Sequence, residues 1–342
     1  MISIAESRCL KSIAIFMMLF LHLFNNLNFQ GLFSPLIFVG DKPLVYYISL
    51  FCDSCVPIFA FVSGYGIYYK YNTKSFGFLD RLKSLKWLYI NLWVIILIFP
   101  ILIGFVFKPD EYPGRLSDIL GNISGLNMTY NGAWWYFTTY VLFVLTCDFW
   151  FKLMNRFNNQ IFLFSIFLVI YIIAFYFRIY KTNLFDSKLL NVVQVTVSLY
   201  FCTLFQFMLG AMTLKFEWRT KLSSLIIKLP YKDLILILAI LCLIFIHALI
   251  PNFIIEPFIG LAFIIIFLNL NILKRIQSFI LFFTAHSTNI WLVHMFFYSI
   301  FFKQFIYGFK YVIPIYTVLI LCCLFSSYII NWMLSRLRYH IK

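Results

Sequence analysis

The chain contains long apolar stretches with almost no charge, and this pattern limits it to few folds. Each stretch is near the length of ~20 residues that a bilayer-spanning helix needs. Hydrophobic residues make up 63% of the 342 residues and charged residues 11%, too little charge to cover a water-facing surface. A soluble enzyme, a disordered chain and a fibrous protein are therefore excluded. The apolar stretches cover 12–29, 46–69, 87–107, 134–151, 161–177, 193–214, 234–250, 254–271, 279–302 and 312–333.

These stretches predict an all-α, polytopic membrane protein of about ten transmembrane helices. We expect one membrane-embedded domain over residues 1–342, because the helices and their loops leave no room for a separate soluble domain. The shortest stretch is 254–271, whose start lies between Pro251 and Pro257. The first stretch is expected to be retained rather than cleaved as a signal peptide, since no small-residue cleavage site follows it.

Basic residues are distributed unevenly between the two sides of the predicted membrane domain. The net charge is +15, and alternating loops place 19 of the 27 Lys and Arg residues on one side and 8 on the other. The positive-inside rule then puts both termini in the cytoplasm, and the cell (plasma or inner) membrane is the expected location. This excess charge indicates contact with anionic membrane lipid. Nucleic acid is not an expected partner, because no basic segment is long enough to form a domain.

The eight cysteines do not indicate a disulfide framework, since most lie inside apolar runs. Cys52 and Cys55 have the C-x-x-C spacing of some redox and metal sites. A second pair of ligands at matching spacing is absent from the sequence, so we expect no metal.

The first stretch carries a polar stripe that ends in a histidine. Arg8, Lys11 and Asn26 each fall within about 40° of His22 on a helix with 3.6 residues per turn. Lys11 and His22 are separated by about 16 Å of helical rise, which puts the cations at the cytoplasmic mouth and the imidazole near mid-membrane. Titratable groups inside spans are costly and are functional candidates. Taken alone, these residues could equally be membrane anchors and a helix-packing histidine.

Two other stretches carry polar residues within the membrane. In the ninth, Ser287, Trp291, His294 and Tyr298 recur at helical spacing, with His294 at a depth comparable to that of His22. In the second, Ser63 and Gly64 would permit either close helix packing or a kink.

Four segments in order resemble the acyltransferase 3 family of membrane O-acyltransferases. Lys11-x10-His22 is similar to its Arg/Lys-x10-His signature, and residues 56–65 to its Phe-Phe-x-x-Ser-Gly-Phe/Tyr segment. Residues 133–143 resemble its aromatic-rich fourth helix, and residues 287–294 its late Ser-x-x-x-Tyr-Leu-x-His segment. One motif departs from the family pattern. The loop Arg81-Leu-Lys-Ser-Leu-Lys86 keeps the charge of the family's Arg-x-x-x-Arg motif but not its spacing.

The resemblance implies transfer of an acyl group, expected to be acetyl, from cytoplasmic acyl-CoA (acetyl-CoA) to a hydroxyl of a cell-surface or lipid-linked saccharide. A phosphate-bearing donor needs cations at the cytoplasmic face. The residues predicted to bind it are Arg8, Lys11, Arg81, Lys83 and Lys86.

His22 is the predicted general base, because imidazole titrates near neutrality. His294 is the second catalytic candidate. Supporting roles, in orienting the base or stabilising the oxyanion, are open to Asn26, Ser63 and Ser287. Aromatic rings at the outer edge of the fourth stretch could stack on sugar or form an interfacial belt; these are Trp134, Trp135 and Tyr136.

Two other classes of function fit the composition. One is a transporter, flippase or polymerase for a lipid-linked saccharide, although no Asp or Glu falls at the centre of a predicted span, where coupled transport usually places carboxylates. The other is a non-catalytic membrane scaffold, which would not explain the polar stripe of the first stretch.

Overall fold

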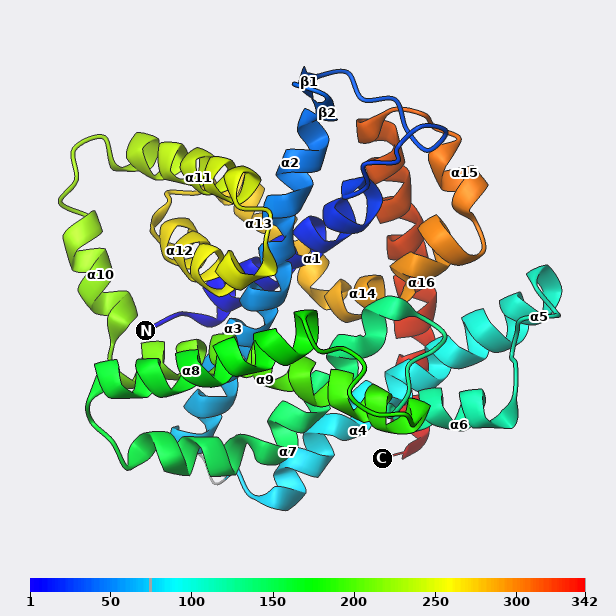
Figure 1. Cartoon of the computed structure of the whole chain (residues 1–342), viewed down its shortest axis with the longest axis horizontal. Coiled ribbons are helices and arrows are strands. Elements are labelled where there is room, and N and C mark those ends of the chain that lie inside the picture. Colours follow the sequence, from blue (N-terminus) through cyan, green and yellow to red (C-terminus); the bar gives the residue numbers. More distant parts are fainter. Residues whose placement is uncertain (74–75, 342) are drawn as a thin grey trace. The chain divides into compact units, whose positions relative to one another are not determined.

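The described residues, 1–73 and 76–341 of a computed structural model, are almost entirely helical, which confirms the all-α prediction (Figure 1). Lys74 and Lys342, which enter the count of basic residues, lie outside them. Two short strands, β1 (Phe38–Val39) and β2 (Lys42–Pro43), pair antiparallel. The helices are α1 (Ile4–Phe24), α2 (Leu44–Phe51), α3 (Cys55–Thr73), α4 (Phe78–Ile96), α5 (Gly104–Phe107), α6 (Leu116–Ser124), α7 (Trp135–Asn155), α8 (Gln160–Ile179), α9 (Lys188–Lys215), α10 (Trp218–Ile226), α11 (Lys232–Leu249), α12 (Glu256–Asn269), α13 (Lys274–Phe282), α14 (Ser287–Met295), α15 (Lys303–Tyr307) and α16 (Val312–Ile341).

All ten apolar stretches fall on helices, and the chain is a multi-pass membrane protein. Among the described residues, eight helical segments are long and apolar enough to cross a bilayer, and a bent pair of helices forms a ninth candidate. The stretch predicted at 254–271 corresponds to the shorter apolar helix Phe253–Asn269. The total of ten spans and the cytoplasmic position of both termini remain predictions.

Several of the stretches contain a change of helical type. A 3-10 turn over Cys52–Ser54 separates α2 from α3. A π-helical segment, Leu97–Ile103, joins α4 to α5 and contains Pro100, which lacks the N–H that a regular helix needs at that position.

The ninth stretch is bent, so the expectation of one helix over 279–302 is wrong. Lys274–Ala285 and Ser287–Ile300 meet at 65°. The break follows a 3-10 turn over Phe283–Ala285 and falls at His286, whose Nδ1 lies 2.9 Å from Ser327 Oγ on α16. A tertiary contact therefore accompanies the bend, and no Pro or Gly marks it in the sequence.

The chain divides into two compact units, each made of three segments. Unit 1 consists of Met1–Met18, Tyr47–Phe78 and Thr139–Thr284. Unit 2 consists of Leu19–Tyr46, Leu79–Thr138 and Ala285–Lys342. The long helix α1 contributes its first part to unit 1 and its last turns to unit 2.

The core of unit 1 is built on a backbone contact between α3 and α9. A Cβ atom added to Gly64 would lie 1.8 Å from the carbonyl oxygen of Phe207, and one added to Gly210 would lie 2.0 Å from that of Phe61. Only glycine permits this approach. The expectation that Ser63-Gly64 allows close helix packing is therefore confirmed.

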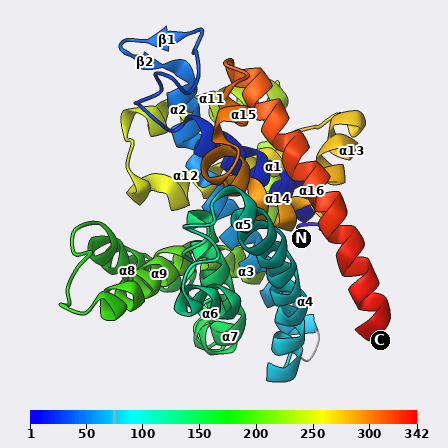
Figure 2. The same cartoon turned by 90° about the vertical axis from the view of Figure 1, so that its right-hand side faces the viewer.

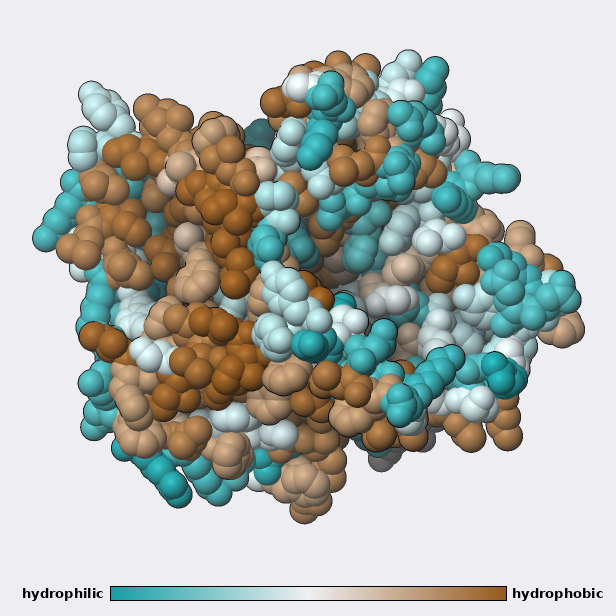
Figure 3. Space-filling view, viewed as in Figure 1, coloured by the Kyte–Doolittle hydropathy of each residue, from teal (hydrophilic) through white to brown (hydrophobic). Residues whose placement is uncertain are grey.

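Other helices of unit 1 pack less tightly. α8 lies beside α9 in both views (Figures 1 and 2). α11 has few buried side chains. In the view of Figure 3, apolar residues cover the outer surface formed by α11 and α12. Such a surface suits contact with lipid.

The core of unit 2 is aromatic. Trp134 is fully buried, and its ring lies 5.7 Å from that of Phe296, which stacks at 4.8 Å on Phe99. α14 packs against α16, the long helix that ends the described chain (Figure 2). These contacts surround the segment that carries His294.

Candidate active site

Two predicted catalytic histidines lie together in unit 2. The ring centroids of His22, near the end of α1, and His294, on α14, are 5.0 Å apart. Tyr298 lies over both rings, at 6.1 Å from His22 and 5.8 Å from His294. His294 is completely buried and His22 is partly exposed. We refer to His22, His294 and Tyr298 as the imidazole cluster.

The hydrogen bond of His294 fixes the roles of its two ring nitrogens. Nδ1 lies 2.6 Å from the carbonyl oxygen of Trp291, which can only accept, so Nδ1 carries the proton and donates. In a neutral ring, Nε2 then holds a lone pair. Nε2 is buried and has no hydrogen-bond partner among the described residues. His294 therefore offers a buried acceptor beside His22.

Side chains from the segment before α7 hold the backbone of α14. The carbonyl oxygen of Leu292 accepts from Asn131 Nδ2 at 3.0 Å and from Trp134 Nε1 at 2.9 Å. In return, Trp291 Nε1 donates to the carbonyl oxygen of Ala133 at 3.1 Å. These bonds hold α14 at Trp291 and Leu292, just before His294, and restrict the position of that residue.

A second polar network ties the start of α14 to α4 and α16. Asn289 Oδ1 accepts from Asn91 Nδ2 at 2.7 Å. Asn289 Nδ2 donates to Ser327 Oγ and to Asn331 Oδ1, both at 2.9 Å. Ser327 Oγ also contacts His286, as described above. Hydrogen-bonded polar groups of this kind fix helix positions inside apolar surroundings.

A tyrosine holds the end of α1 next to His22. Tyr307 on α15 donates from its hydroxyl to the carbonyl oxygen of Leu23 at 3.2 Å. Burial raises the pKa of Tyr307 to about 12. The phenol therefore stays a neutral donor at physiological pH.

The predicted donor cations belong to different parts of the chain. Arg8 and Lys11 lie on the part of α1 in unit 1, and Lys11 shares that helix with His22. Arg81, Lys83 and Lys86 lie on α4 in unit 2, where Arg81 is buried and the two lysines are exposed.

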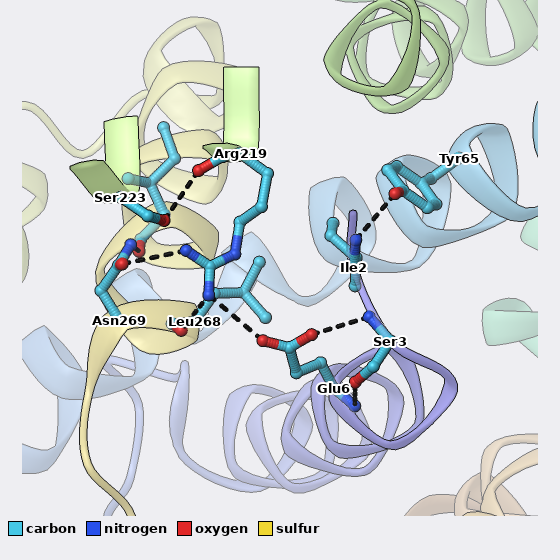
Figure 4. Close-up of polar contacts among 9 residues, drawn as sticks. Ile2, Ser3, Glu6, Tyr65, Arg219, Ser223, Leu268 and Asn269 are labelled. Atoms are coloured by element: carbon cyan, nitrogen blue, oxygen red, sulfur yellow. Dashed lines mark hydrogen bonds and ion pairs between the residues drawn. The ribbon is translucent and has the colours of Figure 1, made fainter. Parts of the chain in front are cut away.

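The beginning of α1 is clamped within unit 1 by Arg219 of α10 (Figure 4). Arg219 Nη2 donates to Glu6 Oε1 at 3.2 Å and to the carbonyl oxygen of Leu268 at 2.7 Å, and Nη1 donates to Asn269 Oδ1 at 2.9 Å. The amide of Ile2 donates to the Tyr65 hydroxyl at 2.8 Å. Glu6 lies less than one helical turn before Arg8, so the clamp holds α1 just ahead of that predicted donor-binding residue.

The predicted position of Asn26 on the polar stripe is wrong. α1 ends at Phe24, and Asn26 is exposed beyond it, where its Oδ1 accepts from the Asn28 amide at 2.9 Å. Asparagine side chains compete for backbone amides in this way and favour turns over helices.

The remaining predicted residues lie in both units. Ser63 is in α3 of unit 1, and Ser287 is buried at the start of α14 in unit 2. Trp134 has no exposed surface with which to stack on sugar, so the structure gives it a packing role. Trp135 is partly exposed, and Tyr136 packs edge-on against Trp291 at 5.9 Å.

One buried acidic group was missed by sequence reasoning. Glu256, the first residue of α12, is 1% exposed and lies near Asp53, which belongs to the 3-10 turn between α2 and α3. The signal in the sequence is an acidic residue inside an apolar stretch. Within the described ranges, no group of three or more His, Cys, Asp or Glu could hold a metal ion.

Comparison with known proteins gives one match. A family model described as an acyltransferase domain, Acyl_transf_3, matches residues 4–335, essentially the whole chain. No curated protein and no solved structure matches it significantly.

Proposed function

This chain belongs to the acyltransferase 3 family, and from that premise we propose that it is a membrane O-acyltransferase using cytoplasmic acyl-CoA as donor. The acceptor is a hydroxyl of a cell-surface or lipid-linked saccharide, the acyl group is acetyl, and the location is the cell membrane. The observation that carries the proposal is the pairing of His22 with His294 at 5.0 Å, in a chain whose family transfers acyl groups.

In this proposal His22 is the general base. It takes the proton from the acceptor hydroxyl while that oxygen attacks the thioester carbonyl. The tetrahedral intermediate then collapses, the C–S bond breaks, and the departing CoA thiolate takes the proton from His22. The ester and free CoA are the products, and the histidine returns to its neutral form.

His294 supports the base in this scheme. Nδ1 of His294 donates a hydrogen bond to the Trp291 carbonyl oxygen. The lone pair on Nε2 can therefore accept a hydrogen bond from protonated His22 and orient that ring. The ring of Tyr298 forms one side of the imidazole cluster. Arg8 and Lys11 bind the donor's phosphates, and the helical rise of α1 sets about 16 Å between Lys11 and His22 for the extended arm of the CoA.

The test is acyl transfer from labelled acyl-CoA to endogenous saccharide in membranes that contain the protein. The His22→Ala variant should lose transfer by about 10²–10⁴-fold, the usual contribution of a positioned acid or base. The matched control is His247→Ala, which removes a buried histidine of α11 outside the imidazole cluster and should retain transfer. Native transfer by His22→Ala, at equal protein in the membrane, would refute the assignment.

One observation favours a second candidate, a transporter or flippase for a lipid-linked saccharide. Carboxyl groups within spans are typical of coupled transport, and in unit 1 the buried Glu256 lies near Asp53, which is partly exposed. If no transfer is detected while Glu256→Gln abolishes saccharide export, the transporter assignment replaces the acyltransferase one. If Glu256→Gln leaves both measurements unchanged, the pair has a structural role.

A further inference from the structure

Unit 1 contains an apolar groove between α8 and α9, at the end where the loop 180–187 joins the two helices. Its volume is about 550 Å³, within the range of about 300–1,000 Å³ usual for small-molecule sites. α8 contributes Ala174 and Phe177, the loop contributes Leu184 and Phe185, and α9 contributes Val193 and Val197. We call this the α8–α9 groove.

The loop wall of the groove is fixed by side chains of α9. Gln194 accepts from the Leu184 amide at 3.2 Å and donates to the carbonyl oxygen of Lys181. Asn191 accepts from the Phe185 amide at 3.0 Å and donates to the Phe185 carbonyl oxygen at 2.7 Å. Leu184 and Phe185 therefore line the groove on a loop whose backbone is already bonded, which reduces the entropy lost when a ligand binds.

Three cations lie in the sequence next to residues that line this end of the groove. Arg178 follows Phe177 on α8, Lys181 lies in the loop, and Lys188 begins α9. The loop contains one acidic residue, Asp186, so the segment has a net positive charge. Across residues 1–73 and 76–341, no ion pair joins any of the three cations to a carboxylate.

The position of the groove matches the structure of a phospholipid. α8 and α9 are successive candidate spans, so the loop between them lies at a membrane boundary, at the depth of lipid headgroups. An apolar channel then runs from the headgroup region toward the bilayer interior, with unpaired cations at its outer end. This is the charge and polarity pattern of a molecule with an anionic phosphate and a hydrocarbon chain.

We infer that the α8–α9 groove binds one anionic phospholipid of the surrounding bilayer. One acyl chain lies along Ala174, Val193 and Val197, and the phosphate lies against Arg178, Lys181 and Lys188. The mostly apolar lining, whose polar side chains are Gln194 and Ser198, favours a hydrocarbon chain over a free sugar or a soluble nucleotide. The preference for an anionic headgroup comes from the three cations, and the chain site comes from the apolar walls.

The experiment compares phosphatidylglycerol with phosphatidylcholine of the same acyl chains. The full chain is purified in detergent, stripped of lipid, and titrated with each lipid while retained lipid is counted by native mass spectrometry and the Tm is measured. We expect one phosphatidylglycerol molecule to be retained per chain and to raise the Tm more than phosphatidylcholine does. Equal effects of the two lipids on the native protein would overturn the inference.

Variants separate the two halves of the site. The triple variant Arg178→Gln/Lys181→Gln/Lys188→Gln should lose the preference for phosphatidylglycerol, since each cation near the surface changes affinity for an anionic lipid by roughly fivefold. The matched control is Lys42→Gln/Lys303→Gln/Lys310→Gln, three cations of unit 2 predicted on the same side, which should keep the preference. An unchanged preference in the first variant would contradict the site.

The groove itself is tested by Val193→Trp, at a position 50% exposed, where a larger side chain can be accommodated without unfolding the helix. This variant should bind both lipids less. A photoactivatable phosphatidylglycerol provides a second measurement, because its chain should crosslink to α8 or α9 in the native protein. Retention of a lipid-linked saccharide in place of phosphatidylglycerol, or crosslinks confined to other helices, would overturn the assignment.

Discussion

The two histidines of the imidazole cluster differ in what their nitrogens can do. His294 donates from Nδ1 to a backbone carbonyl, which leaves Nε2 as an acceptor. His22 is partly exposed. The proposal therefore gives His22 the contact with the acceptor hydroxyl and His294 the task of orienting it.

His294→Asn separates packing from chemistry. The asparagine amide can still donate to the Trp291 carbonyl oxygen, but it has no atom equivalent to Nε2. We expect the variant to keep the Tm of the native protein and to lose transfer by about 10²-fold or more. Native transfer in this variant would show that His294 only packs, and His294→Ala provides the comparison in which both stability and transfer fall.

At the residue scale, the sequence located the two histidines but not the groups that fix them. Helical spacing predicted that His22 and His294 would lie at comparable depths in the membrane. The side chains that hold α14, Asn131 and Asn91, could not be found in the same way, because their bonds join segments more than 150 residues apart. Asn26 was misplaced because a helical period was extended past the point where asparagines end the helix.

At the scale of helices, the contact of α3 with α9 is the most restrictive in unit 1. Gly64→Ala would place a methyl group against the Phe207 carbonyl, and the helices would have to separate. We expect destabilisation of about 1–3 kcal/mol, the usual cost of overpacking, seen as a lower Tm in detergent. Gly66→Ala, where an added Cβ meets nothing within 4 Å, is the matched control and should be neutral or slightly stabilising. Equal Tm values for the two variants would contradict this packing.

A separate prediction concerns the contacts of Arg219 that hold the beginning of α1. Cys9, one helical turn beyond Glu6, is 3% exposed. Arg219→Gln removes two charged hydrogen-bond donors, each worth about 1.5–3 kcal/mol, so maleimide should label Cys9 roughly tenfold faster or more. The background carries Cys242→Ser and Cys322→Ser, because those thiols are exposed or partly exposed. Lys221→Gln, on the exposed side of the same helix α10, should leave the rate unchanged. Unchanged labelling in Arg219→Gln would mean that the clamp does not hold α1.

Apolar length predicted where the helices lie, but not where they break. Pro100 is a visible cause for the π-helical segment of the third stretch. The bend at His286 has no such residue and coincides with its contact to Ser327, which lies 41 positions along the chain. Long-range side-chain contacts of this kind are not encoded in local periodicity.

For the molecule as a whole, the distribution of Lys and Arg predicts orientation. It places the loop 180–187 outside and residues 216–231 in the cytoplasm. In a cysteine-free background, an impermeant maleimide added to intact cells should label Asp186→Cys and should label Ser224→Cys only after permeabilisation. The opposite result would invert the topology and would move the proposed donor entrance to the wrong face.

The direct backbone contact between α3 and α9 also limits how unit 1 can move. No layer of side chains separates these helices at Gly64 and Gly210, so there are no rotamers whose exchange would let one slide past the other. During turnover the pair would travel as one rigid body. An opening that admits or releases a ligand in unit 1 would then come from its other helices or from the connecting segments, such as the 3-10 turn over Cys52–Ser54.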